Sequence, residues 1–304
     1  MRLLPADWLM VLYNVVLAAV WLPLAPVEPA ARWLLAAHVA ALAVPMILAQ
    51  PRQPLSRLGA LLRSTYPLLW LSAFWHELDV HGALVGSAPN DAVVQALERA
   101  LFHLLPSQAW MPAMHGLALS ELMEGFYFAY YVLMLVVPVW ALLRARDEEA
   151  SSDVVLRISL AYVVAFIPFA LAPTASPMAL FPRYVGGNAH GLFRSVNDFL
   201  RASGDAAGTG FPSSHVTAVI GLAWLSWRHL PRPFARVATV VAAGVVPATV
   251  YTQNHFVVDA LAGVALGLGA QLALDPALQR LRAVRPIGGR LGLRAVPQTE
   301  PEAA

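Results

Sequence analysis

Eight apolar stretches, each close to the length of a membrane crossing, constrain the fold of this 304-residue chain more than any other feature. A helix needs roughly 20 mostly apolar residues to cross a bilayer, and prolines and glycines separate these stretches. A hydrophobic share of 59% and a charged share of 12% exclude an ordinary soluble domain. We therefore expect an all-α, polytopic membrane helical bundle with about eight transmembrane helices. The predicted spans are 8–24, 33–49, 66–85, 117–143, 154–172, 212–230, 234–250 and 255–274.

The placement of arginine predicts the orientation of the bundle. The chain has no lysine, so all 20 basic residues are arginine. If the spans alternate from an inner N-terminus, 15 arginines lie inside and five outside, as expected for cytoplasmic loops. Exclusive arginine use and abundant alanine indicate a GC-rich bacterium. We therefore expect a multi-pass protein of the bacterial inner membrane with both termini cytoplasmic. The absence of cysteine excludes disulfides and thiolate chemistry.

Three polar segments outside or at the ends of the spans carry further signals. Residues 90–106 place apolar residues at helical spacing and predict an amphipathic helix at the interface. Residues 188–210 predict a second short helix before a Gly-rich segment. The sequence HELDVH, 76–81, does not fit a zinc protease helix, because its histidines are five residues apart rather than four. We interpret its acidic residues and second histidine as meeting water at the outer interface.

Two predicted spans begin on the same side of the membrane with polar residues. The sequence GFPSSH, 210–215, starts the sixth span, and its proline and serines suit the first turn of a helix. The sequence NHFVVDALAG starts the eighth span and puts His255 and Asp259 four residues apart, on one helix face. Both spans run from outside to inside, so we expect His215, His255 and Asp259 to meet at the outer face.

This grouping suits phosphoryl transfer. Helix N-termini present free backbone N–H groups and a positive dipole end, and both favour an anion. A carboxylate that accepts the Nδ1 proton of His255 leaves Nε2 as a nucleophile, while His215 can protonate the leaving oxygen. The alternative is that these residues are satisfied structural polar groups, because their convergence is inferred from topology alone.

The same residues resemble two motifs of the type 2 phosphatidic acid phosphatase (PAP2) superfamily. Pro212, Ser213 and His215 match its P-S-x-H motif, and His255 and Asp259 match its H-x3-D motif. The motifs are 40 residues apart with one span between them, as in the superfamily. The resemblance implies that His255 is the nucleophile and forms a phosphohistidine, that Asp259 orients it, and that His215 is the general acid.

The chain also departs from the superfamily pattern. The common first motif, K-x6-R-P, cannot be present without a lysine, and Ala248 and Thr249 stand where a Ser-Arg pair is expected. FPSSH and VYTQNHFVVD look more like the inositol phosphorylceramide synthase-like branch, whose proline-rich first motif has its counterpart here in PTASPM, 173–178. This counterpart lacks the arginine of that branch, and Arg183 is the nearest substitute, with Arg194 and Arg201 behind it.

The resemblance divides the chain into three regions. These are an N-terminal transmembrane hairpin with a cytoplasmic loop (1–63), a PAP2-like membrane catalytic domain with a six-helix core (64–274), and a cytoplasmic Arg-rich tail (275–304). It implies a lipid phosphatase or phosphotransferase that acts on a phospholipid or lipid phosphate at the outer leaflet, facing the periplasm or exterior. We favour headgroup transfer of the inositol phosphorylceramide synthase kind, with diacylglycerol, ceramide or a polyol as hydroxyl acceptor. We expect no metal, no cofactor and no nucleic acid partner.

A face of the fourth span predicts a pocket for a headgroup or an acceptor. Its polar residues recur at three- and four-residue steps, and carboxylates within a span are costly unless they serve a cavity. A structural hydrogen-bond network is the alternative. Together with the helix starts and arginines, this face completes our set of substrate-binding candidates: Ser213, Ser214, Arg183, Arg194, Tyr251, Asn254, Glu121, Glu124 and Tyr127.

Two other classes of function stay open. An intramembrane serine hydrolase could use Ser213 or Ser214, but neither serine lies in a G-x-S-x-G elbow. A non-catalytic lipid-binding membrane protein could keep the fold, and the missing first-motif cation favours this alternative.

Overall fold

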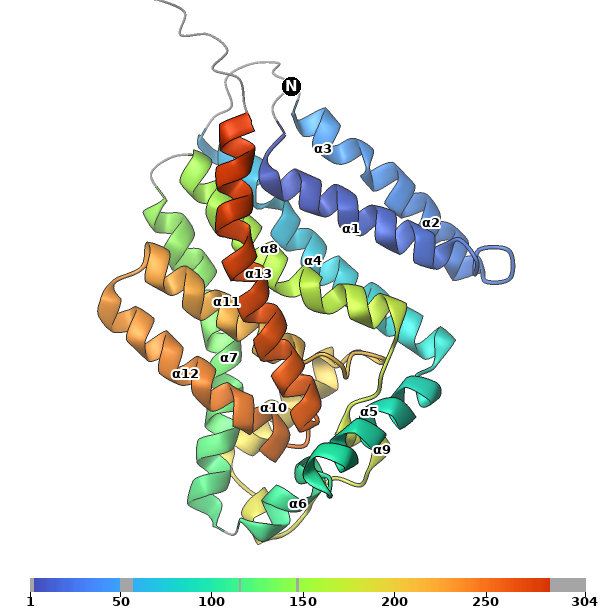
Figure 1. Ribbon diagram of the computed structural model, residues 1–304, viewed down its shortest axis with the longest axis vertical. Helices are drawn as coiled ribbons and strands as arrows, with labels where there is room; N and C mark the ends of the chain where they lie inside the picture. Colours follow the sequence, from blue (N-terminus) through green and yellow to red (C-terminus); the bar gives the residue numbers. More distant parts are fainter. Residues whose placement is uncertain (1–2, 50–56, 115, 146–147, 285–304) are drawn as a thin grey trace, which may run out of the picture. The chain divides into compact units, whose positions relative to one another are not determined.

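The computed structural model describes residues 3–49, 57–114, 116–145 and 148–284, and these residues form helices and connecting loops (Figure 1). One isolated bridge joins Thr174 to Thr209 within them. The helices are α1 (Pro5–Trp21), α2 (Pro29–Ala41), α3 (Ala43–Leu48), α4 (Arg57–Val85), α5 (Ala88–Phe102), α6 (Pro106–Ala113), α7 (Leu117–Arg144), α8 (Glu148–Leu171), α9 (Pro177–Leu180), η1 (Gly187–Ala189), α10 (Leu192–Gly204), α11 (Ser214–His229), α12 (Arg232–Tyr251) and α13 (Val257–Val284).

Among the described residues, five helical stretches are long and apolar enough to cross a membrane, which confirms the all-α, multi-pass membrane class. They are Pro29–Leu48, Leu117–Arg144, Ala150–Leu171, Arg232–Tyr251 and Val257–Ala277. The other three predicted spans fall in α1, α4 and α11. The first and last of these helices have only 17 and 16 residues, and α4 carries the polar sequence HELDVH in its second half.

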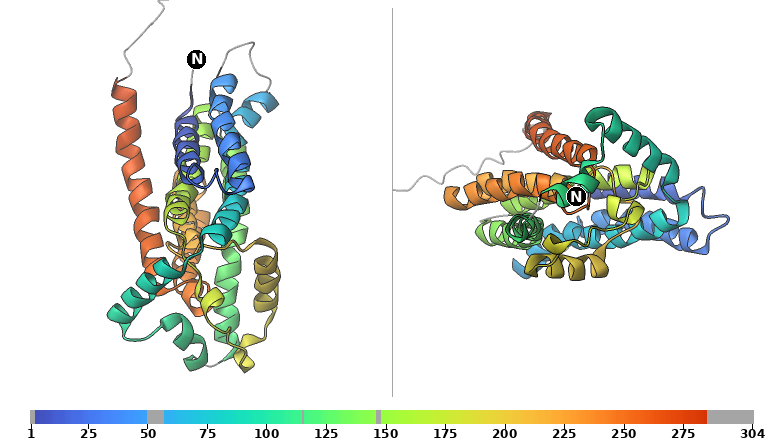
Figure 2. Two further views of the ribbon diagram at one scale, coloured as in Figure 1. Left: turned by 90° about the vertical axis from the view of Figure 1, so that its right-hand side faces the viewer. Right: turned by 90° about the horizontal axis from the view of Figure 1, so that it is seen from below.

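The chain divides into two compact units, residues 1–271 and 272–304. In the larger unit α11 packs against α7, α8 and α12, and α8 also packs against α1 and α4. The short helices α5, α6, α9 and α10 gather at the end of the unit where α7 begins (Figures 1 and 2). The predicted interface helix over 90–106 corresponds to α5, and the predicted short helix after residue 188 corresponds to α10.

Two small residues let α13 approach α11 closely. A Cβ on Gly263 would lie 2.7 Å from the carbonyl oxygen of Ser213, and one on Gly267 would lie 2.9 Å from that of Thr217. Their four-residue spacing puts both glycines on one face, as in the small-xxx-small contacts of membrane helices. This close contact brings the first turns of α11 and α13 together.

Buried polar groups join the N-terminal helices to α4. Glu77 accepts hydrogen bonds from the indole N–H of Trp21 and from His38, and Asp7 accepts them from Arg63 and Tyr66. Carboxylates within the apolar part of a bundle need such partners.

The interpretation that HELDVH meets water is therefore wrong for two of its residues. Glu77 and His81 are buried in the larger unit, where Trp21 of α1 contacts both and His38 of α2 contacts Glu77. Asp79 accepts a hydrogen bond from the backbone N–H of Ala207 at 2.7 Å, so it fixes a loop near the predicted site.

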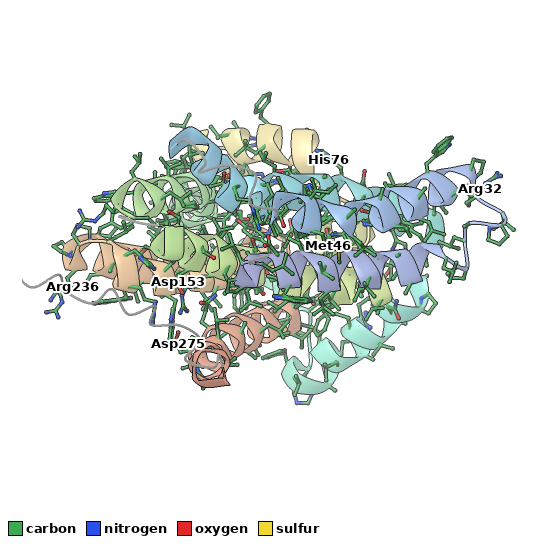
Figure 3. All side chains as sticks on the ribbon, turned by 90° about the horizontal axis from the view of Figure 1, so that it is seen from above. Arg32, Met46, His76, Asp153, Arg236 and Asp275 are labelled. Atoms are coloured by element: carbon green, nitrogen blue, oxygen red, sulfur yellow. The ribbon has the colours of Figure 1, made fainter. Side chains whose placement is uncertain are left out.

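The opposite end of the unit carries a separate ionic group on α8 and α11, at the end seen in Figure 3. Asp153 accepts hydrogen bonds from Arg157 at 3.0 Å and from His229 Nε2 at 3.0 Å. His229 therefore has a structural partner. In the same view Arg236 points outward from the edge.

Candidate active site

Three loop segments that are far apart in the sequence meet at the start of α11. The backbone N–H of Gly210 donates to the carbonyl of Thr174 at 2.7 Å, and the Ser213 N–H donates to the Asp259 carbonyl at 2.9 Å. The N–H of Ala175 donates to the carboxylate of Asp91 on α5 at 2.6 Å. The PTASPM turn, the GFPSSH turn and the first turn of α13 are thus fixed to one another through backbone hydrogen bonds.

The two histidines of these turns lie in direct contact. His255 Nε2 is 3.4 Å from His215 Nδ1, and His215 Nε2 is 3.0 Å from the hydroxyl of Tyr127 on α7. On its other side His255 Nδ1 is 2.9 Å from the carbonyl oxygen of Gly210. The predicted convergence of the sixth and eighth spans is therefore present in the fold.

The hydrogen-bond partners define one consistent set of tautomers. A carbonyl can only accept, so His255 Nδ1 carries the proton that points to Gly210, and Nε2 keeps its lone pair. His215 Nδ1 can then donate toward His255 Nε2, while His215 Nε2 accepts from the hydroxyl of Tyr127. The result is a nucleophilic nitrogen on one ring facing a proton donor on the other.

Asp259 lies next to this pair but is not the closest acceptor. Its Oδ2 is 3.7 Å from His255 Nδ1, and the same oxygen accepts the backbone N–H of Phe256 at 2.7 Å. Its Oδ1 is buried without a hydrogen-bond partner among the described residues. The Gly210 carbonyl thus holds the Nδ1 proton that we expected Asp259 to accept, and the carboxylate contributes its charge from slightly farther away.

The two helix N-termini differ in their availability to an anion. At the start of α13, the backbone N–H groups of Val257 and Val258 donate to the Glu98 carboxylate of α5 at 3.0 Å each. At the start of α11, Ser213 Oγ accepts only from Val216 at 3.3 Å. Throughout the described ranges no hydrogen bond takes up the N–H groups of Ser214 and His215. Of these two termini, as the described residues show them, that of α11 is the one free for a phosphate.

The arginines after the PTASPM turn are already paired with carboxylates. Arg183, Arg194 and Arg201 each lie 3.8 Å from an oxygen of the buried Glu124, and each also contacts Asp198. Partial burial tends to raise the pKa of Asp198, but hydrogen bonds from Arg201 and Arg183 hold that pKa below its usual value. The two carboxylates therefore balance two of the three arginine charges and leave the cluster with one positive charge.

A cavity of about 300 Å³ opens onto both histidines. Among the predicted site residues it is lined by Tyr127, Ser214, His215, Asn254 and His255. Its other lining residues are Trp75, Ser176, Met178, Ala179, Asp205, Ala206, Ala207 and Thr209.

The remaining predicted binding residues lie outside this lining. Ser213 and Asp259 are buried and are joined by a backbone hydrogen bond of 2.9 Å. Arg183, Arg194 and Glu124 belong to the ionic cluster, and two further residues have other partners. Glu121 accepts the backbone N–H groups of Leu192 and Phe193 and thereby caps α10. Tyr251 is buried and accepts a hydrogen bond from Asn188.

A family comparison assigns the chain to a class. A family model of the PAP2 superfamily matches residues 93–273, from α5 to α13, so it includes both histidines and Glu98. The chain belongs to the PAP2 superfamily, and the predicted superfamily is confirmed. This membership indicates a phosphatase-type enzyme with a lipid phosphate substrate in a membrane. Neither a curated protein nor a solved structure matches the chain.

The Glu98 carboxylate has an expected effect on both stability and activity. We expect Glu98→Gln to lower the unfolding free energy by about 2 kcal/mol, because a neutral amide loses the charge that stabilises the α13 terminus. We also expect kcat to fall roughly tenfold, since α13 carries His255 and small displacements are costly in catalysis. Thermal unfolding and turnover of the purified protein measure both. Arg99→Ala, on the exposed face of the same helix, is the control, and wild-type behaviour of both variants would contradict this role.

Proposed function

We propose that the protein transfers or hydrolyses the phosphoryl group or phospho-headgroup of a membrane lipid through a phosphohistidine on His255. The observation that carries this proposal is the contact between His255 Nε2 and His215 Nδ1 on the wall of one cavity. An in-line displacement on phosphorus requires a nucleophilic lone pair and a proton donor within reach of the leaving oxygen, and the two rings supply both groups. Family membership supports the same substrate class.

The proposed reaction has two half-reactions that use the same groups. In the first, His255 Nε2 forms a bond to phosphorus while the bond from phosphorus to the leaving oxygen breaks. His215 gives its Nδ1 proton to that oxygen while its Nε2 takes the proton of the Tyr127 hydroxyl, so that the ring stays neutral. In the second, an acceptor hydroxyl or water gives a proton to His215 Nδ1 while Nε2 returns its proton to Tyr127, the acceptor oxygen attacks phosphorus, and the P–N bond breaks. The enzyme ends in its starting protonation state.

We propose that backbone N–H groups rather than arginines make the first contacts to the phosphate. The N–H groups of Ser214 and His215 are free and lie at the positive end of α11. The side chains of Ser214 and Asn254 line the same cavity and can add hydrogen bonds. Arg183 and Arg194 can contribute only at longer range, because Glu124 and Asp198 hold them.

We favour transfer to a lipid hydroxyl over hydrolysis, in the manner of the inositol phosphorylceramide synthase-like branch. The FPSSH and VYTQNHFVVD sequences support this branch, and apolar lining from Trp75, Met178 and Ala179 suits a lipid acceptor better than bulk water. The distribution of arginine supports an outer-leaflet site.

An acceptor panel tests this proposal. Purified protein is incubated with phospholipids and lipid phosphates, alone or with diacylglycerol, ceramide or inositol, and products are identified by mass spectrometry. We expect headgroup exchange that requires an added hydroxyl acceptor and exceeds release into water. If release into water is the same with and without each acceptor, the protein is a phosphatase. If no lipid gives a product, the result supports the non-catalytic alternative.

The serine hydrolase alternative finds no support in the site. In the part of the chain that the structure describes, no hydrogen bond joins the hydroxyl of Ser213 or Ser214 to a histidine, although such a contact activates a serine nucleophile. The hydroxyl of Ser213 caps α11 instead.

A further inference from the structure

One peptide unit lies directly behind the nucleophile of the proposed reaction. It joins Gly210 to Phe211, and its carbonyl oxygen accepts the Nδ1 proton of His255 at 2.9 Å. The N–H group of the same unit donates to the hydroxyl oxygen of Thr174 at 2.5 Å. A trans peptide unit is planar, and its N–H and C=O groups point in opposite directions. The direction of the carbonyl that holds His255 is therefore fixed from the far side by Thr174.

Thr174 holds this turn with both of its oxygen atoms. Its carbonyl oxygen accepts the N–H of Gly210 at 2.7 Å, so the consecutive N–H groups of Gly210 and Phe211 both donate to one residue. Such a close approach needs a glycine, because a Cβ at position 210 would lie 2.6 Å from the carbonyl oxygen of Ala175. Thr174 is buried, and a hydrogen bond in such surroundings is stronger than one in water.

Helix α5 fixes the position of Thr174. The Asn90 side chain donates to the carbonyl of Pro173 at 2.9 Å, and the buried Asp91 carboxylate accepts the N–H of Ala175 at 2.6 Å. Both chain neighbours of Thr174 are thus anchored to the same helix. This anchoring places the threonine hydroxyl before any substrate binds, as expected for a residue that supports a reacting group.

The reactivity of His255 depends on which of its nitrogens carries the proton. In a neutral imidazole one nitrogen carries the proton and the other the lone pair, and the hydrogen bond at one nitrogen selects between the two tautomers. A proton on Nε2 would remove the lone pair that faces His215. Hydrogen bonds in a chain polarise one another, so donation from the Phe211 N–H to Thr174 makes the Gly210 carbonyl a better acceptor for the Nδ1 proton.

Asp259, which the superfamily resemblance implies as the residue that orients His255, is less well placed to select the tautomer. Its Oδ2 is 3.7 Å from His255 Nδ1 and already accepts the backbone N–H of Phe256 at 2.7 Å. A nitrogen–oxygen distance of 3.7 Å is longer than a hydrogen bond. The Gly210 carbonyl is therefore the acceptor that selects the tautomer.

We propose that Thr174 is a positioning residue, which keeps the proton of His255 on Nδ1 and the lone pair on Nε2 through the Gly210–Phe211 peptide unit. The inference rests on the proposed function, because the lone pair serves catalysis only if His255 attacks phosphorus. Thr174 lies outside the residues that line the cavity. Its loss must therefore act on the chemical step rather than on substrate binding.

The first test reads the tautomer of His255 in the absence of substrate. ¹⁵N NMR of histidine-labelled protein distinguishes a protonated ring nitrogen from one with a lone pair, and the His255 signals are those missing in His255→Ala. We expect the Nδ1 proton in the wild type and in Thr174→Ser, which keeps the hydroxyl. Thr174→Val keeps the shape but loses the acceptor, so the ratio of tautomers should shift about tenfold or more towards Nε2.

Thr217→Val is the matched control for this measurement. Thr217 is also buried, but its hydroxyl donates to the carbonyls of Ser213 and Gly263 instead. We expect no change of tautomer in this variant. A shift of the same size as in Thr174→Val, or a proton on Nε2 of His255 in the wild type, overturns the proposal.

Asp259→Asn tests the proposal without any change at Thr174. We expect the proton of His255 to stay on Nδ1 in this variant, because the Gly210 carbonyl still accepts it. A proton on Nε2 would show that the carboxylate selects the tautomer. That result would overturn the proposal even if Thr174→Val does not fold.

Kinetics separate this inference from the proposed function. The probe is the p-nitrophenyl ester of phosphatidic acid, whose leaving group needs no proton, so that the rate reports the attack by His255. Thr174→Val should lower kcat about 10- to 100-fold with KM within about twofold of the wild type, and Thr174→Ser should restore most of kcat. If His255→Ala abolishes turnover but Thr174→Val changes neither tautomer nor kcat, only this inference is wrong. If the tautomer depends on Thr174 but His255→Ala keeps the wild-type rate, only the catalytic proposal is wrong.

Discussion

His255→Ala will abolish turnover of every lipid that the wild-type protein uses, by roughly 10⁴-fold or more, because the variant loses the group that we propose attacks phosphorus. The reason is geometric. His255 Nε2 keeps its lone pair because its other nitrogen donates to the Gly210 carbonyl at 2.9 Å. His215 Nδ1 carries a proton in the same arrangement, so it cannot replace the missing nucleophile. Product formation followed by mass spectrometry measures the loss.

A trapped intermediate makes this prediction more specific. Wild-type protein quenched during turnover of a ³²P-labelled lipid should carry acid-labile label, as expected for a phosphohistidine, and His255→Ala should carry none. His190→Ala is the matched control, because His190 is an exposed histidine that lies outside the cavity lining. Label retained by His255→Ala, or turnover at the wild-type rate, would place the nucleophile on another residue and end the mechanism proposed here.

The sequence alone predicted how the site is assembled. Local sequence signals mark both helix starts. They are a proline and serines at the start of α11, and a histidine and an aspartate four residues apart at the start of α13. Alternating spans between them put both helix starts at the same end. The two glycines that let α13 approach α11 belong to a small-xxx-small pattern that is also legible in the sequence.

The partners of these groups could not be predicted, because they are set by tertiary contacts. Glu98 caps α13 from 159 residues earlier in the chain, on a helix whose pattern indicates only an interface. Of the residues that line the cavity, Asp205 lies in a Gly-rich loop with no motif of its own, and Trp75 is one of nine tryptophans. The pairing of Arg183 with Asp198 depends on how α10 folds back beside α7. Sequence patterns predicted the helices and the candidate reacting residues, whereas the electrostatics of the site required coordinates.

His215→Ala will reveal its role through the leaving group. We expect the variant to lower kcat for a natural lipid by about 10²- to 10⁴-fold, because an aliphatic alkoxide needs a proton to leave. The leaving group of a p-nitrophenyl ester of the same phosphate departs without protonation, so kcat of the same variant should fall less than about tenfold for this ester.

Tyr127→Phe provides a graded comparison, because it removes the hydroxyl that donates to His215 Nε2 at 3.0 Å but leaves the imidazole in place. It should lower kcat for the lipid by about tenfold through loss of tautomer control, and leave the p-nitrophenyl ester almost unaffected.

Steady-state kinetics with both esters separate proton donation from structural support. If His215 merely supports His255 through the 3.4 Å contact between their rings, then both esters must slow equally in His215→Ala, since attack on phosphorus is common to them. If His215 is the proton donor, the loss must depend on the basicity of the leaving oxygen and grow steadily from phenol to alcohol. Tyr127 contacts the other nitrogen of the His215 ring and so acts on the same proton. The loss of kcat in Tyr127→Phe must therefore also grow with the basicity of the leaving oxygen, but less steeply. If the two variants differ in the size of their effect on kcat but share the same dependence on the leaving group, the contacts that run from Tyr127 to Gly210 serve a single function. That function is to control one proton next to one lone pair.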